Sequence, residues 1–329
     1  MSRTRLALLL CLSAAIAQAE PVTELHYVMG TYYRITAEGH DVVPVLRGCF
    51  QDARRLEHVY SRFEADSELS RVNATAGAPQ VVSEEFARLL RRSIALGTAT
   101  GGVFDVTVGP LTELWRNGDA RPTAAEVAAA RARVGSAHIR LDGRRLELPD
   151  GHRLDFDGIA KGWAVDGCVA RLRAAGIGRA LVSLGESSVY ALGVPAGEDA
   201  WALEVRGVEP DEAVGVLRLR DEGLSVSATF GGSGRAGRVV GHVVDPRTGE
   251  ALAEPAVAVV VSASATDAEA FSKALLLWGA GGVDRVEALG ARGAVHVGGV
   301  VSQGRATRAR RLFEAFAAPR PLTAVVARP

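Results

Sequence analysis

Apolar residues recur along this chain with the spacing that helices and strands require. In Val42–Tyr60 and Glu84–Thr98 they fall at three- and four-residue steps, which predicts two amphipathic helices. Ala265–Trp278 predicts another helix, and the β-branched run Val257–Val261 predicts a buried strand. Helical and strand patterns follow one another without a recognisable linker through residues 20–315, so one intertwined domain is favoured over two separable ones.

The stretch Arg153–Gly178 has the pattern of a strand, a turn and a helix in succession. Apolar and acidic residues alternate at its start, and apolar residues then gather on one helical face. Asp157 stands where a helix N-cap is expected, and Gly158 stands in the turn. Free backbone N–H groups and the helix dipole at such a turn can bind a phosphate, and Lys161 adds a positive charge. An ordinary helix start with an exposed lysine explains this stretch equally well when it is taken alone.

Glycine-containing turns adjoin several predicted elements. Met29-Gly30-Thr31 separates two strands predicted within Val22–Ala37, and Gly101-Gly102 precedes an alternating run. Such glycines allow the backbone to approach a ligand closely, or they simply end a helix. The polar segment Ser61–Asn73 carries one large apolar residue in its first half, Phe63, and packing into the core is the simplest interpretation of that residue.

Composition narrows the fold and the partners. Only 5% of the 329 residues are aromatic while 37 are glycine, which favours an α/β protein with many tight turns over a β-sandwich. The 38 basic and 38 acidic residues cancel, and no basic stripe stands out, which argues against nucleic-acid binding. The cysteines and histidines lack the spacing of a metal site.

Both ends of the chain are expected to lie outside the folded domain. Arg3 and Arg5 precede the apolar run Leu6–Ile16, and Ala17-Gln18-Ala19 follows as a cleavage site, so residues 1–19 are predicted to be a secretory signal peptide. This run is too short to span a bilayer, and no later segment is a credible span. The final residues, 316–329, show no pattern and are expected to be disordered.

The three cysteines leave two arrangements open. Cys11 lies in the predicted signal peptide, and the leucines before it disfavour a lipid anchor there. Cys49 and Cys168 could pair in an oxidising compartment, or they could remain two buried thiols, because both lie in apolar helical patterns.

Several segments occur together in the order found in one protein family. The matching blocks are Met29-Gly30-Thr31, Ser61–Asn73, Gly102–Leu111, Asp155–Asp166, Leu181–Gly185 and His242–Gly249, with Ala268–Ala274 as a divergent last signature. Together they resemble the ApbE family, the FAD:protein FMN transferases. The resemblance implies an α/β fold of mixed sheets with surrounding helices. It also implies that FAD binds, and that its FMN half moves with the help of a magnesium ion onto a Ser or Thr hydroxyl of a partner protein while AMP leaves.

The resemblance also assigns functions to individual residues. It implies FAD contacts from Met29, Phe63, Val103, Phe104, Asp105, Asp155, Lys161 and Val243. Lys161 would lie near the pyrophosphate and would act in catalysis together with Glu269. The metal site would be formed by the Gly158 carbonyl, Glu269, Ser272 and the position of Lys273. Phe63 stands where the family usually has Tyr, which preserves stacking but removes a hydroxyl.

The last signature departs from the family pattern. Glu269 and Lys273 stand where the family has Asp and Thr, which face the ion from one side of a helix. Glu can still ligate magnesium, whereas a charged Lys cannot, and the two could form an i,i+4 ion pair instead. We hypothesise that the Lys273 ammonium partly replaces the ion, or that the metal binds more weakly with help from Asp267 or Ser272. Glu186-Ser187 is a second departure, because the family usually has Gly followed by an acidic or amide residue.

The leading interpretation is a periplasmic flavin transferase that modifies an exported or membrane-associated electron-transfer protein. One alternative is a non-catalytic protein that binds and delivers FAD after losing its metal site, and Lys273 is the residue that favours it. The other alternative is a magnesium-dependent FAD pyrophosphatase, in which water takes the place of the protein hydroxyl.

Overall fold

The computed structural model describes residues 20–117, 121–208, 213–229, 243–297, 300–304, 313–314 and 324–326. The predicted signal peptide and most of the predicted disordered tail lie outside these ranges, as does His242. No helix within them is long and apolar enough to cross a membrane.

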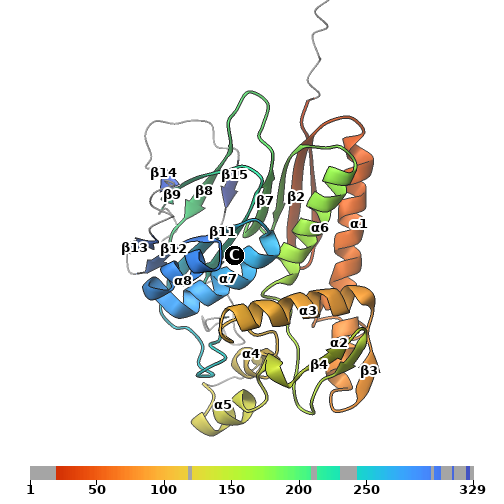
Figure 1. Ribbon diagram of the computed structural model, residues 1–329, viewed down its shortest axis with the longest axis vertical. Helices are drawn as coiled ribbons and strands as arrows, with labels where there is room; N and C mark the ends of the chain where they lie inside the picture. Colours follow the sequence, from red (N-terminus) through yellow and green to blue (C-terminus); the bar gives the residue numbers. More distant parts are fainter. Residues whose placement is uncertain are drawn as a thin grey trace, which may run out of the picture.

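The centre of the molecule is an eight-stranded antiparallel sheet (Figure 1). Its strands, in spatial order, are β1 (Val22–Val28), β2 (Thr31–Glu38), β6 (Arg179–Leu184), β7 (Ser188–Leu192), β10 (Glu222–Ala228), β11 (Ala256–Ser262), β12 (Arg292–Val297) and β13 (Val300–Gln303). The fold is therefore α/β with mixed sheets, as expected from the sequence, although the central sheet itself is antiparallel.

Helices cover one face of this sheet and a second sheet covers the other. The covering helices are α1 (Val42–Tyr60), α6 (Ala160–Ala174), α7 (Ala265–Trp278) and α8 (Val283–Ala288), with a 3-10 turn η3 (Gly279–Gly282) after α7. The second sheet has the order β14 (Phe313–Glu314), β9 (Ala213–Leu219), β8 (Trp201–Arg206) and β15 (Ala324–Val326). β15 lies in the segment that was expected to be disordered, and it pairs in parallel with β8.

The residues of β11 show why both faces are buried. Val257, Val259 and Val261 pack toward the second sheet, whereas Ala258 and Val260 pack toward the helices. Because successive side chains of a strand point to opposite faces, a strand that is buried on both sides is apolar throughout. The prediction of a buried strand here is confirmed.

A smaller layer lies below the central sheet in Figure 1. It contains α2 (Glu68–Ala74), α3 (Glu84–Ala99), α4 (Gly109–Asn117), α5 (Ala124–Arg131), η1 (Ser136–His138) and the three-stranded sheet β3 (Pro79–Val81), β5 (Arg145–Glu147), β4 (Arg140–Asp142). Most of this layer shares one apolar core with the helical face of the central sheet. The predicted helices 42–60 and 265–278 have the predicted bounds, and 84–98 ends one residue later than predicted.

The stretch before α6 differs from its prediction. Only Arg153 forms an isolated bridge, to Val108, so no strand precedes the turn. The helix begins at Ala160 with Ile159 at its N-cap, and Asp157 is not the cap. Asp155 explains the difference, because its carboxylate accepts the Asp157 N–H at 2.9 Å and closes a turn before the helix can begin.

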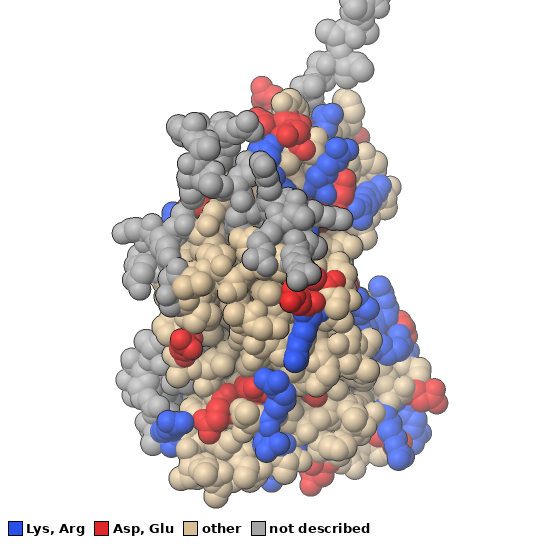
Figure 2. Space-filling model, turned by 60° about the vertical axis from the view of Figure 1, so that its left-hand side comes forward, with Lys and Arg blue, Asp and Glu red and all other residues tan. Residues whose placement is uncertain are grey.

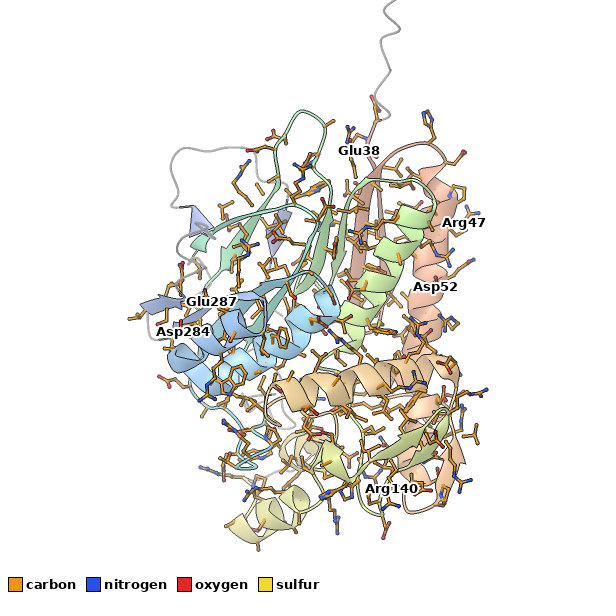
Figure 3. All side chains as sticks on the ribbon, viewed as in Figure 1. Glu38, Arg47, Asp52, Arg140, Asp284 and Glu287 are labelled. Atoms are coloured by element: carbon orange, nitrogen blue, oxygen red, sulfur yellow. A yellow bond between two sulfur atoms is a disulfide. The ribbon has the colours of Figure 1, made fainter. Side chains whose placement is uncertain are left out.

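Charges on the surface are mixed rather than segregated. On the face in Figure 2, basic and acidic side chains lie close together around a largely uncharged centre. Opposite charges also connect the two long helices, since Arg171 on α6 donates to Asp52 on α1 at 2.6 Å. Asp52 is labelled in Figure 3.

Cys49 on α1 and Cys168 on α6 are joined by a disulfide, across a sequence separation of 119 residues. Of the two arrangements left open by the sequence, the structure has the cross-linked one. Both residues are buried in the main core, so the bond fixes the contact between two helices that cover the central sheet.

We predict that reduction of this disulfide destabilises the fold by about 2–4 kcal/mol, because the bond restricts the unfolded chain over a long loop. Urea unfolding of the wild-type protein with and without dithiothreitol measures the difference. The Cys49→Ala/Cys168→Ala double variant is the matched control, and its unfolding midpoint should not respond to the reductant. A wild-type midpoint that ignores dithiothreitol contradicts the prediction.

Candidate functional site

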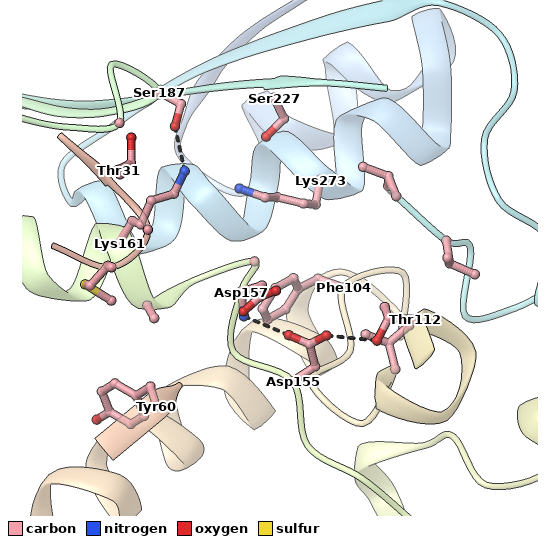
Figure 4. A pocket seen from close by; sticks show the side chains of 18 of the residues that line it. Thr31, Tyr60, Phe104, Thr112, Asp155, Asp157, Lys161, Ser187, Ser227 and Lys273 are labelled. Atoms are coloured by element: carbon pink, nitrogen blue, oxygen red, sulfur yellow. Dashed lines mark hydrogen bonds between the residues drawn. The ribbon is translucent and has the colours of Figure 1, made fainter. Parts of the chain in front are cut away.

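A cavity of about 930 Å³ opens where the central sheet, α6, α7 and the lower layer meet (Figure 4). This volume lies at the upper end of the range for small-molecule sites. Segments from across the chain form its wall, so that residues far apart in the sequence share one space. Ten of the predicted site residues line it: Met29, Phe63, Val103, Phe104, Asp105, Asp155, Gly158, Lys161, Val243 and Lys273. Glu269 and Ser272 do not line it.

The β1–β2 turn places Met29 at the cavity. Val28 pairs with Thr31, so the turn has only two residues, and both have positive φ angles: 53° at Met29 and 73° at Gly30. This geometry suits the twist of a hairpin, but it is costly for a residue other than Gly, Asn or Asp. Backbone strain of this kind gathers at functional sites.

Phe63 is not packed into the core, and 78% of its surface is exposed. The hydroxyl of Ser61 accepts the N–H groups of Phe63 and Glu64 at 3.2 Å, which holds the loop in place. The guanidinium of Arg62 lies 4.2 Å from the centre of the Phe63 ring, and its Nε donates to Asp157 at 2.7 Å. The simplest interpretation of Phe63 from sequence is therefore wrong, and one face of the ring is available to a planar ligand.

Asp155 is a buried carboxylate in the cavity wall. It accepts hydrogen bonds from the Thr112 hydroxyl and the Asp157 N–H, both at 2.9 Å. Burial, followed by repulsion from the Asp157 carboxylate, raises the pKa of Asp155 from 3.8 to about 6. Asp157 itself accepts from Arg62 and from Arg116, the latter at 3.1 Å.

Asp105 uses its carboxylate to hold the chain rather than to face the cavity. One oxygen accepts from the N–H and hydroxyl of Thr107, at 2.8 and 2.6 Å, and the other accepts from the Ser136 N–H at 2.9 Å. A ligand beside Val103, Phe104 and Asp105 would therefore meet mainly the Phe104 ring and the backbone.

The turn before α6 has fewer free N–H groups than the sequence predicts. The N–H of Asp157 donates to Asp155, and those of Ile159 and Ala160 both donate to the Phe156 carbonyl at 2.9 Å. The expectation that this backbone cradles a phosphate is wrong for these three groups. The dipole of α6 and the side chain of Lys161 are what remain to attract an anion there.

Lys161 and Lys273 extend into the same part of the cavity from α6 and α7 (Figure 4). The Lys161 ammonium donates to the Ser187 hydroxyl at 2.7 Å. The Lys273 ammonium lies 3.7 Å from a carboxylate oxygen of Glu269. Burial lowers the pKa of Lys273, Glu269 opposes this shift, and Lys161 adds to it, which indicates that the two ammonium groups interact.

Glu269 is completely buried behind Lys273, with 0% of its surface exposed. One of its oxygens accepts a hydrogen bond from the Ser188 hydroxyl, and the other has no hydrogen-bond partner. Ser272 is engaged elsewhere, with its hydroxyl 2.9 Å from that of Ser225 and 2.7 Å from that of Ser227 on β10. Asp267 does not line the cavity and pairs with Arg92 instead, so the structure gives no support to the hypothesis that it assists a metal.

These donors do not fit a magnesium ion. Magnesium requires near-octahedral oxygen ligands at about 2.0–2.1 Å. A Cβ at Gly158 would lie 3.9 Å from Cε of Lys273, so the Lys273 side chain extends from α7 to within van der Waals reach of the Gly158 turn. An ammonium offers no lone pair and repels a divalent cation. Elsewhere in the described part of the chain, His58, Glu64 and Asp66 bring ligand-type atoms within 4.8 Å of one another, but exposed groups of this kind are common without an ion.

Sequence reasoning missed several residues of the site. Thr112 and the two arginines that bind Asp157 were given no function from the sequence, and Ser187 was noted only as a departure from the family pattern. The folded backbone brings these residues to the site. Asp166 ends a block that was recognised, yet no function was assigned to it. Its carboxylate accepts from the N–H groups of Ala265 and Thr266 at 2.9 Å, and so fixes the start of α7 on α6.

Together, the fold and the site define an α/β protein with one large cavity that offers an aromatic ring at its rim and two ammonium groups in its wall. The family model for ApbE matches residues 29–292, and this chain belongs to the ApbE family. It is 30% identical to an FAD:protein FMN transferase of Vibrio cholerae over 83% of this chain and 86% of that protein. For an FAD:protein FMN transferase of Salmonella typhimurium the identity is 29%, over 76% and 77% of the two chains. The solved flavinyl transferase ApbE of Pseudomonas stutzeri, in its apo form, superimposes with a TM-score of 0.79 at 26% identity over 92% of this chain and 99% of that chain.

We predict that Asp155 makes the stability of this protein depend on pH. Because its pKa is raised from 3.8 to about 6 in the folded state, its contribution is greatest below the lower value and is lost as the pH rises through the higher one. One pKa unit corresponds to about 1.4 kcal/mol, so the unfolding free energy of the wild type, minus that of Asp155→Asn, should fall by about 2.5 kcal/mol between pH 4 and pH 7.

Urea unfolding of the two proteins across this pH range measures the effect. Asp157→Asn is the matched control, because removing the neighbouring charge should move the fall to lower pH. Parallel curves for the wild type and Asp155→Asn would show that Asp155 does not titrate in this range.

Proposed function

We propose that this protein is an FAD:protein FMN transferase. It would move the FMN half of FAD onto a Ser or Thr hydroxyl of a partner protein, form a phosphoester and release AMP. The observation that carries the proposal is the convergence of Lys161, the α6 terminus and the exposed Phe63 ring on one cavity. Membership of a family whose relatives are FAD:protein FMN transferases supports it.

The cavity offers a separate environment for each part of FAD. Phe63 at the rim presents an aromatic face that suits a flat ring system. Lys161 lies deeper, where it can meet the diphosphate. In the reaction the acceptor oxygen bonds to the FMN phosphorus as the bond from that phosphorus to the bridging oxygen breaks. The bridging oxygen and its electron pair leave with AMP, and the hydroxyl proton passes to solvent.

Lys161 is the residue that would offset the developing charge. Negative charge grows on the phosphate oxygens and on the departing AMP, and a fixed ammonium group stabilises it. Ser187 holds this ammonium at 2.7 Å, so its position is set before the ligand arrives. Glu269, which the resemblance places in catalysis, would act through Lys273, because it does not reach the cavity.

Magnesium assistance, implied by the family resemblance, is not part of this mechanism. When bound to a family member the ion would offset charge on the diphosphate. Here Lys273 occupies the space beside Gly158, and the Glu269 carboxylate is shielded from the cavity.

The partner and the location are also part of the proposal. The signal-like residues 1–19 support export to the periplasm, and the acceptor would then be an exported or membrane-associated electron-transfer protein. One observation favours a different function: Lys273 stands where a metal-binding Thr is usual in the family. That favours a protein that binds and delivers FAD without transferring FMN.

The decisive experiment incubates the purified protein with FAD and an extract of exported proteins from the source organism. We expect a fluorescent band on a denaturing gel, an FMN mass increment on a Ser or Thr peptide, and AMP in the supernatant. AMP without a labelled protein would indicate a pyrophosphatase, and bound FAD without AMP would indicate a carrier.

We further predict that Lys161→Met lowers the transfer rate by about 100-fold, the usual cost of removing one group that stabilises transition-state charge. Arg91→Met is the control for loss of a positive charge, because Arg91 pairs with Glu84 outside the cavity. Equal transfer rates for Lys161→Met and the wild type would exclude Lys161 from the reaction.

A further inference from the structure

The chain contains only two lysines, Lys161 and Lys273, among its 38 basic residues, and every other basic residue is arginine. Both lysines line the same cavity. They come from different helices, 112 positions apart by their residue numbers. Ammonium side chains therefore occur only in this cavity, where the two lysines converge.

The two side-chain types are not equivalent at such a position. An ammonium is a small point charge with three donors that can turn toward any oxygen, whereas a guanidinium is planar and larger. Lys273 passes close to Gly158, with 3.9 Å between its Cε and the position of a Cβ there. Lys161 passes close to Gly185, whose Cβ position lies 3.6 Å from Nζ. Each lysine therefore extends past a glycine, which leaves its side chain room to enter the cavity.

Glu269 supplies the counter-charge that keeps Lys273 in place. Its carboxylate is fully buried, and one oxygen has no hydrogen-bond partner. A buried carboxylate without a cation is costly, and among the described residues Lys273 is its ion-pair partner. The spacing of one helical turn puts the ammonium between the carboxylate and the cavity.

We propose that this protein binds the diphosphate of FAD between two ammonium groups, with Lys273 on its Glu269 support in place of a divalent ion and Lys161 opposite it. Two ammonium groups would then face the two negative charges of the diphosphate, with Glu269 behind Lys273 offsetting one of the positive charges. FAD binding is then independent of magnesium. This inference rests on the proposed function only in taking FAD as the ligand.

The first test measures the dissociation constant of FAD by fluorescence titration, in excess EDTA and in magnesium chloride. We expect the two constants to agree within about twofold for the wild type. In EDTA, Lys273→Met should weaken binding by about 10- to 100-fold, the effect of losing one charge-assisted hydrogen bond. Arg91→Met, which removes a positive charge outside the cavity, should bind FAD like the wild type.

The second test uses the fact that only two side chains carry an ammonium group. Acetylation with a limiting reagent, followed by mass spectrometry, reports Lys161 and Lys273 separately. In EDTA, FAD should protect both lysines from acetylation, at the same FAD concentrations at which binding is observed. This readout needs no variant, so it holds even where Lys273→Met fails to fold.

Any of three results would overturn the inference. EDTA could abolish FAD binding, or Lys273→Met could bind FAD as tightly as the wild type does. The third result is a Lys273 that is still acetylated in the FAD complex. All three leave FAD as the ligand, so the proposed function would survive them. FAD that fails to bind under any condition, magnesium included, would instead overturn the proposed function.

Discussion

The close contact between α6 and α7 is the constraint on which the site depends. A Cβ at Gly162 would lie 2.5 Å from the Ala265 carbonyl oxygen, so only glycine allows α6 to approach the start of α7 this closely. Asp166, one turn further along α6, accepts hydrogen bonds from Ser264, Ala265 and Thr266, and so adds to the Ser264 N-cap at the start of α7. This contact fixes where both lysines enter the cavity, since each is carried by one of the two helices.

The central sheet holds α7 from its other side. Successive residues of β10 point to opposite faces, so Leu224 and Val226 enter the core under the second sheet while Ser225 and Ser227 contact Ser272 on α7. A polar contact inside an apolar layer fixes both rotation and position, because hydroxyls that lose their partners there would be costly. The wall that carries Lys273 is thereby rigid, and a rigid wall can hold a charge in place before a ligand binds.

The helices and the family could be predicted from the sequence, but the geometry of the site could not. Periodicity located α1 and α3 because each has one continuous apolar face, whereas α7 was predictable from a longer, mostly apolar run that is buried on nearly all sides. Periodicity failed before α6, where the Asp157 N–H donates to the Asp155 carboxylate and this hydrogen bond competes with the helix; such local competition leaves no periodic signal. The surroundings of Phe63 and Glu269 were likewise not predictable, because exposure at a cavity rim and burial behind a lysine depend on contacts between distant segments.

Replacing a bound ion by a lysine affects the affinity for FAD and the rate of FMN transfer to different extents. An ammonium is permanently attached, so its presence does not depend on a metal supply, and the Glu269 carboxylate neutralises it when no ligand is present. The Lys273 ammonium carries half the charge of a magnesium ion and cannot coordinate two oxygens at fixed geometry. Ground-state binding of a diphosphate needs only enough positive charge nearby, whereas the transition state concentrates new charge on a few oxygens. The Glu269–Lys273 pair therefore preserves affinity for FAD more completely than it preserves the rate of FMN transfer, and the rate depends correspondingly more on Lys161.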